Sequence, residues 1–225
     1  WTNLVRGSPS DTTTKLERKM TQSNDPLLQP YRLKHLTLKN RIMSTAHEPA
    51  YSEDGMPKDR YRLYHVEKAK GGIAMTMTAG SASVAQDSPP AFGNLLAYKD
   101  EVVPWLKRLA DDCHEHDCAV MIQLTHLGRR TGWNKGDWLP VLAPSPVREP
   151  AHRAFPKEIE DWDIERIVAD YADAAERMQA ARDPSKLDRR DLSVSMGLVR
   201  EVSHQIRLRQ LLDRVQKLVC ISVGN

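Results

Sequence analysis

The sequence predicts an α/β fold in which helices cover a parallel sheet, either a doubly wound sheet or a (β/α)8 barrel. Strand-like and helical segments alternate three times between residues 33 and 181. The strand-like segments are continuous apolar runs rather than half-polar alternations, which is typical of strands buried on both faces. Polar side chains follow these runs directly, at the edge where parallel α/β folds bind ligands.

The first expected elements are a hairpin, a strand and a helix. Regularly spaced apolar residues predict a short N-terminal hairpin and the strand that it feeds, at Leu33, Leu36, Leu38 and Ile42. That strand should end near Ser44 or Thr45. A helix over 59–70 follows, closed by the glycines at 71–72, and the apolar run 73–78 predicts the second strand.

The later elements repeat this order. Apolar residues recur at helical spacing over 101–116 and predict a second helix, and the run 119–124 predicts a third buried strand. A long amphipathic helix opens at Asp161, which we expect to be its N-cap, and ends near Ala181. Residues 25–181 are therefore expected to form the folded unit.

Length and composition exclude several classes of protein. The chain has 225 residues, of which 40% are hydrophobic and 28% charged, as in ordinary globular proteins. No run of about 18 apolar residues could span a bilayer, and the N-terminal stretch lacks the apolar region of a secretory signal. We expect a cytoplasmic protein that does not bind membranes.

The net charge of +3 is a sum over unlike segments. Residues 1–19 carry 4 basic and 2 acidic side chains, residues 20–181 carry 20 and 23, and residues 182–225 carry 9 and 5. We expect residues 1–24 to be a disordered leader. The basic tail over 182–225 contains no Phe, Tyr or Trp, and its apolar spacing allows a helix over 206–219.

Cysteine and histidine spacings favour neither disulfides nor a metal site. Cys113, Cys118 and Cys220 show no CxxC spacing, so we interpret them as free thiols. His114 and His116 lie two positions apart on a helix, which points their imidazoles to different sides. We expect no metal.

Candidate ligand-binding residues follow the predicted strands. They are four residues after the first strand, a glycine after the second and the one polar residue within the third: Thr45, Ala46, His47, Glu48, Gly80 and Gln123. The carboxyl ends of parallel strands meet at one edge, which makes these residues neighbours. An amide offers a donor and an acceptor, as the imide edge of a ring requires; the alternative is that neighbouring backbone satisfies Gln123.

Four ordered motifs resemble the Old Yellow Enzyme family of FMN oxidoreductases. They are Leu38-Lys39-Asn40-Arg41-Ile42, Lys70-Gly71-Gly72, Gln123-Leu124-Thr125-His126-Leu127-Gly128-Arg129 and Leu142-Ala143-Pro144-Ser145. The resemblance runs from about Asp25 to Ala181. It is greatest to the long-chain branch that includes 2,4-dienoyl-CoA reductase, trimethylamine dehydrogenase and N-methylproline demethylase.

The resemblance implies the N-terminal part of a (β/α)8 TIM barrel with FMN at its carboxyl mouth. Residues 45–48 would lie along the flavin, Gly80 would approach it, and Gln123 would hydrogen-bond its pyrimidine edge. His126, Gly128 and Arg129 match a family turn that we interpret as loop scaffolding rather than flavin ligands.

The implied activity is that of an NADH:flavin oxidoreductase. Hydride would pass to an activated alkene or from an N-methyl amine, with NAD(P)H as electron partner and a small molecule as substrate.

Two positions depart from the family. Trimethylamine dehydrogenase carries, at the position of Glu48, the cysteine that bonds its flavin, and a carboxylate cannot form that thioether. FMN should therefore be noncovalent here. Glu48 could instead pair with a cationic amine substrate or face solvent. Ala46 stands where most members carry proline, which implies a looser turn.

The larger departure follows Ala181. The family has there a further strand and its catalytic Tyr or His side chains, and its longer members also carry a 4Fe–4S cluster and FAD. We expect none of these in this chain, as after a truncation or frameshift. About three and a half βα units cannot close the barrel, so we expect no catalysis by this fragment and possible self-association through the open edge.

A second hypothesis treats the protein as a noncatalytic binding module. The basic tail would then bind an acidic partner or RNA through Arg189, Arg190, Arg207 and Arg209. No aromatic residues are interleaved for base stacking, which weighs against nucleic acid.

Overall fold

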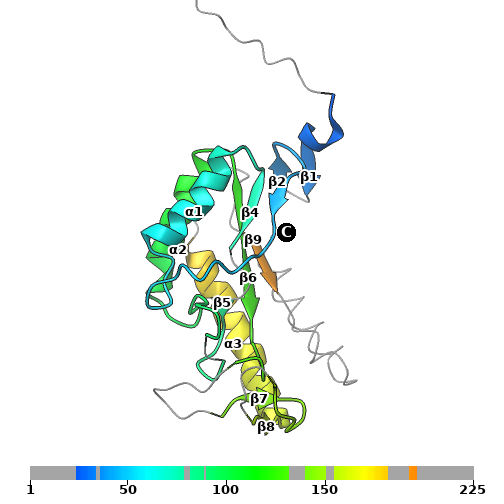
Figure 1. Cartoon of the computed structure of the whole chain (residues 1–225), viewed down its shortest axis with the longest axis vertical. Coiled ribbons are helices and arrows are strands. Elements are labelled where there is room, and N and C mark those ends of the chain that lie inside the picture. Colours follow the sequence, from blue (N-terminus) through cyan, green and yellow to red (C-terminus); the bar gives the residue numbers. More distant parts are fainter. Residues whose placement is uncertain are drawn as a thin grey trace, which may run out of the picture.

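The fold is a parallel sheet with three helices packed on one of its faces (Figure 1). It is seen in a computed structural model that describes residues 24–33, 36–78, 82–88, 90–131, 140–150 and 155–181, and the backbone of 193–196. A doubly wound sheet carries helices on both faces, whereas a barrel carries them on its outer face alone. The described helices all share one face, so the fold is a partial α/β barrel.

The sheet is built around one central strand, β6 (Ala119–Thr125). β4 (Met75–Met77), β5 (Ala82–Ser83) and β9 (Ser193–Met196) pair with β6, and β3 (Met43–Ser44) pairs with the far edge of β4. Every one of these pairings is parallel. Met121 pairs with both Met77 and Ser193, and Leu124 pairs with both Ala82 and Met196. Because a strand has only two edges, β4 and β5 follow one another along one edge of β6 and β9 lies on the other.

The expected N-terminal hairpin is confirmed. β1 (Tyr31–Leu33) and β2 (Leu36–Leu38) pair antiparallel. Leu36 and Leu38 pack against Met75 and Ala119, the first residues of β4 and β6. The hairpin therefore covers the amino end of the sheet and leaves the carboxyl end to the loops.

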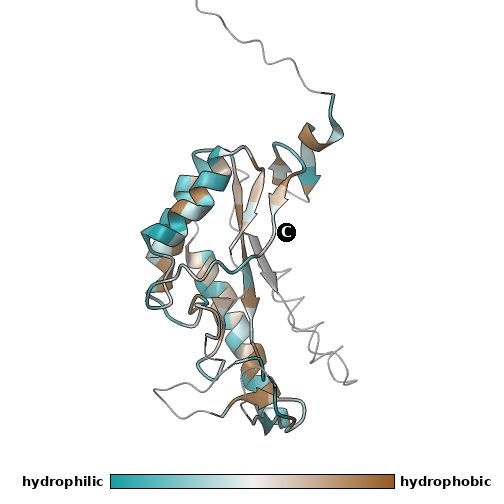
Figure 2. Ribbon diagram, in the orientation of Figure 1, coloured by the Kyte–Doolittle hydropathy of each residue, from teal (hydrophilic) through white to brown (hydrophobic). Residues whose placement is uncertain are grey.

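Three helices form where the apolar spacing predicts them. α1 (Asp59–Lys70) has the expected bounds, α2 (Val102–His114) is slightly shorter than expected, and α3 (Asp161–Ala180) is the long helix. In Figure 2 α1 shows mostly hydrophilic residues, whereas the strands beside it are largely hydrophobic. This contrast follows from burying one stripe of each helix against the sheet.

The expected N-cap of α3 is wrong by one residue. The cap is Glu160, whose side chain accepts the backbone N–H of Asp163. The Asp163 carboxylate in turn accepts the Glu160 N–H over 2.9 Å and the Lys157 ammonium over 2.5 Å. This reciprocal capping box satisfies two backbone N–H groups at the helix start. Asp161 as the N-cap would satisfy only one of them.

Alternate residues of β6 face opposite sides of the sheet. Val120, Ile122 and Leu124 are fully buried in the main core with residues of the three helices. Met121 packs on the other side, against the cluster beneath the hairpin. That second side is the interior face of the partial barrel, and Gln123 lies on it.

The structure corrects the expectation that no strand follows the long helix. β9 pairs with residues 121–124 of β6 in the place of a fourth barrel strand. The backbone N–H and C=O groups on that edge of β6 would otherwise lack partners, which favours any extended segment that can reach it.

Further short strands lie in segments expected to be loops. β5 is one, and β7 (Leu142–Ala143) pairs with β8 (Lys157–Glu158) near the start of α3. Residues 1–23 of the expected leader, the expected helix over 206–219 and the arginines of the basic tail lie outside the described residues. Within the described part of the chain, no helix is both long and apolar enough to cross a membrane.

Candidate functional site at the carboxyl ends of the strands

The segment after β3 starts at the carboxyl end of that strand and is held by the loop before α2. The Ser52 hydroxyl donates to the Gly93 carbonyl over 2.6 Å. Gly93 has a φ of +69°, and a Cβ there would lie 3.2 Å from the Cα of Ala50. Glycine therefore permits both the left-handed backbone and the close approach of the two segments.

This segment carries four of the candidate residues. Thr45 and His47 are exposed, and Ala46 and Glu48 are half-buried. All four lie beyond the carboxyl end of β3, as the sequence predicts. Gly80 lies outside the described residues.

Glu48 is not a solvated surface carboxylate. Its Oε1 accepts the Ala50 N–H over 2.9 Å, whereas its Oε2 is buried and has no hydrogen-bond partner in the described part of the chain. Burial raises the pKa of Glu48 from 4.5 to about 7, against the opposing effect of the Ala50 N–H. The side chain is thus held part-way between its charged and neutral forms near neutral pH.

Gln123 is the polar residue of the interior face. It is half-buried, and it follows Met121 toward the carboxyl end of β6. The β4 pairing ends at Met121 and the β5 pairing begins at Leu124, so Gln123 lies level with the break between these two strands. None of the side-chain hydrogen bonds among the described residues involves its amide, and the residue is partly exposed.

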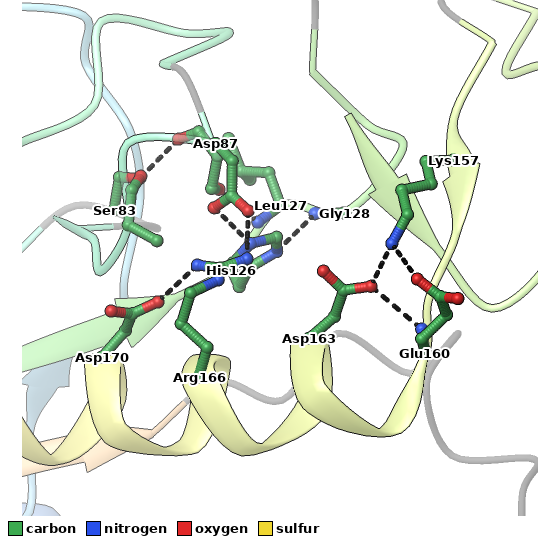
Figure 3. Close-up of polar contacts among 12 residues, drawn as sticks. Ser83, Asp87, His126, Leu127, Gly128, Lys157, Glu160, Asp163, Arg166 and Asp170 are labelled. Carbon is green, nitrogen blue, oxygen red and sulfur yellow. Dashed lines mark hydrogen bonds and ion pairs between the residues drawn. The ribbon is translucent and has the colours of Figure 1, made fainter. Parts of the chain in front are cut away.

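The turn after β6 is held by side chains from two other elements (Figure 3). The His126 N–H donates to the Tyr171 hydroxyl over 2.8 Å, and the Leu127 N–H donates to Ser88 Oγ over 2.7 Å. The Gly128 N–H donates to Nδ1 of the His126 ring over 3.2 Å. Three consecutive backbone donors are therefore fixed, which supports the interpretation of this turn as scaffolding.

The His126 ring joins this turn to a buried ion pair. Because Nδ1 accepts from Gly128, the ring proton resides on Nε2, which lies 3.2 Å from Asp87 Oδ1. Arg166 on α3 pairs with the other oxygen of Asp87 and, over 2.8 Å, with Asp170. Burial alone would raise the pKa of Asp87, but the hydrogen bonds from His126 and Arg166 and the charge of Arg166 outweigh burial and lower it.

Sequence reasoning missed Asp87, Ser88, Arg166 and Tyr171. Asp87 and Ser88 lie in an irregular loop, where no periodicity marks a buried residue. Tyr171 belongs to the apolar stripe of α3, which predicts burial but not the use of its hydroxyl. Only the fold brings these residues to His126.

Another buried polar pair lies between the sheet and the helices that cover it. His65 Nδ1 lies 2.7 Å from Thr76 Oγ1, and both side chains are fully buried between α1 and β4. Burial lowers the pKa of His65 from 6.5 to about 3, helped by the charge of Lys68. This imidazole is therefore neutral and belongs to the core rather than to the mouth of the barrel.

The described residues contain no group of three or more His, Cys, Asp or Glu side chains placed to hold a metal ion. Cys113 and Cys118 are free buried thiols, and Cys220 lies outside the described residues.

Known proteins resemble this chain across the same region. Residues 26–184 match the NADH:flavin oxidoreductase / NADH oxidase family. A probable N-methylproline demethylase of Rhizobium meliloti is 73% identical over 157 residues, which are 70% of this chain and 23% of that protein. A multifunctional alkene reductase/demethylase of Caballeronia cordobensis is 52% identical over the same shares of the two chains. The chain therefore spans about a quarter of the length of these relatives.

Solved structures show the same fold. Morphinone reductase in complex with tetrahydroNAD superposes with a TM-score of 0.72 at 17% identity, over 89% of this chain and 62% of that chain. An Old Yellow Enzyme homologue from Zymomonas mobilis gives 0.73 at 19% identity, over 88% and 60%. Together with the match over 26–184, the partial barrel identifies this chain as a member of the NADH:flavin oxidoreductase / NADH oxidase family.

Proposed function

We propose that the protein is an FMN-dependent oxidoreductase in which these residues form part of the flavin-binding barrel. FMN would supply the site that accepts or gives a hydride. Family membership over 26–184 supports this proposal, as do the names of the relatives, which are reductases, demethylases and dehydrogenases. The proposed substrate is a small molecule, either an N-methyl amine or an activated alkene, with NAD(P)H as electron partner.

The single observation that carries the proposal is the Gln123 amide. It lies half-buried on the interior face with no hydrogen-bond partner among the described residues. An amide carries both a donor and an acceptor, which complement the acceptor and the donor of a flavin's imide edge. Gln123 would therefore orient the ring system, with residues 45–48 and Gly80 beside it. FMN would be bound noncovalently, because the carboxylate of Glu48 cannot form a thioether.

FMN titration of the 225-residue chain tests this role. We expect weak, saturable quenching of flavin fluorescence, and we expect Gln123→Met to reduce the affinity about tenfold because it removes a donor and an acceptor at similar volume. Met121→Leu is the matched control, since it lies two residues earlier on the same face and should bind FMN as the unaltered chain does. Equal affinity of Gln123→Met and the unaltered chain would refute the role of the amide.

Catalysis by this chain alone is not expected, because the described strands are too few to close a barrel of about eight. Tight FMN retention together with NAD(P)H oxidation by the 225-residue chain would contradict that expectation. It would show that the chain forms a complete flavin site.

A further inference from the structure

We propose that the Glu48 carboxylate is the anionic anchor for the ammonium group of an N-methyl amine. This inference rests on the proposed function, because it assigns a residue to one of the two substrate classes named there. Three observations on Glu48 carry it: the unused carboxylate oxygen, the absence of a compensating cation among the described residues, and the position of the residue just beyond the carboxyl end of β3.

The first observation is the unused oxygen. Glu48 Oε2 is buried and receives no hydrogen bond from any described residue, whereas Oε1 accepts the Ala50 N–H. A buried carboxylate oxygen without a donor is costly, and native proteins keep such groups where a ligand or ion completes them. The missing group is a hydrogen-bond donor, which an ammonium supplies.

The second observation is charge. Two basic side chains of α1 have other partners: Arg60 lies over the Tyr51 ring at 4.0 Å, and the Lys68 ammonium donates to Ser44 Oγ over 2.9 Å. Within the described residues, burial and the Ala50 N–H are the influences on the Glu48 pKa, and no basic side chain contributes. A carboxylate that is partly desolvated and uncompensated attracts cations and repels anionic ligands.

The third observation is that the backbone around Glu48 is held in one conformation just beyond the carboxyl end of β3. Glu48 lies four residues beyond the end of β3, and the segment that carries it is held by the Ser52 contact to Gly93. Ala50, whose N–H fixes Oε1, has a left-handed φ of +55°. Such a conformation is unfavourable for alanine, so the surrounding structure maintains the orientation of the carboxylate. The anchor is thereby preorganised at the edge where barrel enzymes bind substrates.

A pair of ring compounds tests the anchor on the 225-residue chain without FMN. N-methylpyrrolidinium is a cation, and N-methyl-2-pyrrolidone is a neutral ring of similar size. We expect saturation-transfer NMR and calorimetry to show preferential binding of the cation. Glu48→Gln should weaken it about tenfold or more while leaving the neutral ring unchanged. Glu165→Gln, at an exposed position on α3, is the matched control and should bind both probes as the unaltered chain does.

The pH dependence gives a second measurement that needs no substitution of Glu48. With a pKa of about 7, the carboxylate is about one-tenth ionised at pH 6 and about nine-tenths ionised at pH 8, so cation affinity should rise about tenfold between them. His47 is the exposed histidine next to Glu48 in the chain, and the control variant His47→Gln should retain the rise.

The outcomes separate this inference from the proposed function. Cation binding that ignores both Glu48→Gln and pH overturns the anchor, as does the absence of any cation preference. FMN binding that depends on Gln123, together with either of those results, refutes the anchor alone. Glu48-dependent cation binding in a chain that does not bind FMN supports the anchor and removes support from the proposed function.

Discussion

His126 Nε2 lies 3.2 Å from Asp87 Oδ1, and this contact joins the turn after β6 to the loop after β5. Arg166 of α3 holds the second oxygen of the same carboxylate. Asp87 therefore binds two elements that are 39 and 79 positions away from it in the chain. The carboxyl end of β6, where Gln123 lies, is positioned by this three-way contact.

Removing the charge of Asp87 should destabilise the fold. Asp87→Asn leaves Arg166 without its buried counterion and should cost about 2 to 3 kcal/mol, at the lower end for a broken buried pair because Arg166 is partly exposed. Urea unfolding at neutral pH measures the cost. Asp173→Asn, at an exposed position of α3, is the control. A cost no larger than that of the control would show that the contact contributes little.

Lowering the pH should remove the stabilisation that the ionised Asp87 gives to the fold. The pKa of Asp87 is lowered in the folded chain from its ordinary 3.8, so its stabilisation is fully present above that value and is lost as the pH falls through the folded pKa. The difference in unfolding free energy between the unaltered chain and Asp87→Asn should be constant from neutral pH down to about pH 5 and shrink below about pH 4. A difference that grows in acid would contradict this assignment.

His65 should make the fold weaken at mildly acidic pH. Its folded pKa of about 3 lies far below 6.5, so the unfolded chain binds the proton first. Below about pH 6.5, stability should fall by up to about 1.4 kcal/mol per pH unit until the folded group also titrates near pH 3. Unfolding curves from pH 7 to pH 4 measure this slope.

A double substitution isolates the His65 effect. The His65→Leu/Thr76→Val pair removes both partners of the buried contact, which avoids leaving one polar group unsatisfied. The double variant should lose the slope between about pH 6.5 and pH 4 that His65 contributes. His65→Leu alone should be less stable than the double variant, because the Thr76 hydroxyl would then be buried without its partner. Persistence of the full slope in the double variant would assign it to other groups.

The Tyr171 hydroxyl should contribute to the stability of the fold, although Tyr171 belongs to the apolar stripe of α3. Tyr171→Phe leaves the buried His126 N–H without an acceptor and should cost about 1 to 3 kcal/mol in thermal or urea unfolding. Tyr31→Phe, at an exposed ring in the hairpin, is the control and should change stability by less than about 0.5 kcal/mol. Equal effects of the two substitutions would contradict the role of the hydroxyl.

The buried thiols should be unreactive in the folded chain. Burial raises the pKa of Cys113 to about 12 and that of Cys118 to about 11, so neither forms thiolate near neutral pH. In a Cys220→Ser background, a thiol reagent should label neither residue natively and both in denaturant. Rapid native labelling would show that α2 or the start of β6 opens readily.

Local sequence patterns predicted most of the individual elements. The helix over 59–70 has the predicted bounds because its apolar spacing and closing glycines act within the helix itself. The cap of α3 was misplaced because Glu160 and Asp161 both have suitable side chains, and only the reciprocal bond with Asp163 selects Glu160. β9 was missed because its pairing depends on the open edge of β6, which no local pattern reveals.

The candidate site, too, could be predicted from the sequence only in part. Gln123 stands out in the sequence as a polar residue within an apolar strand, and the positions of residues 45–48 follow from the end of the preceding strand. The half-buried state of Glu48 could not be predicted, because it depends on how the segment over the mouth packs.

The sequence by itself determined the parallel α/β class, the order of the helices and the family, since these depend on periodicities and motifs within short stretches. The tertiary structure decided between a barrel and a doubly wound sheet by placing the described helices on one face. It also decided which buried polar groups are satisfied, such as Asp87, and which are not, such as Glu48 Oε2. The reason is that hydrogen bonding and desolvation depend on neighbours that the fold brings together from distant parts of the chain.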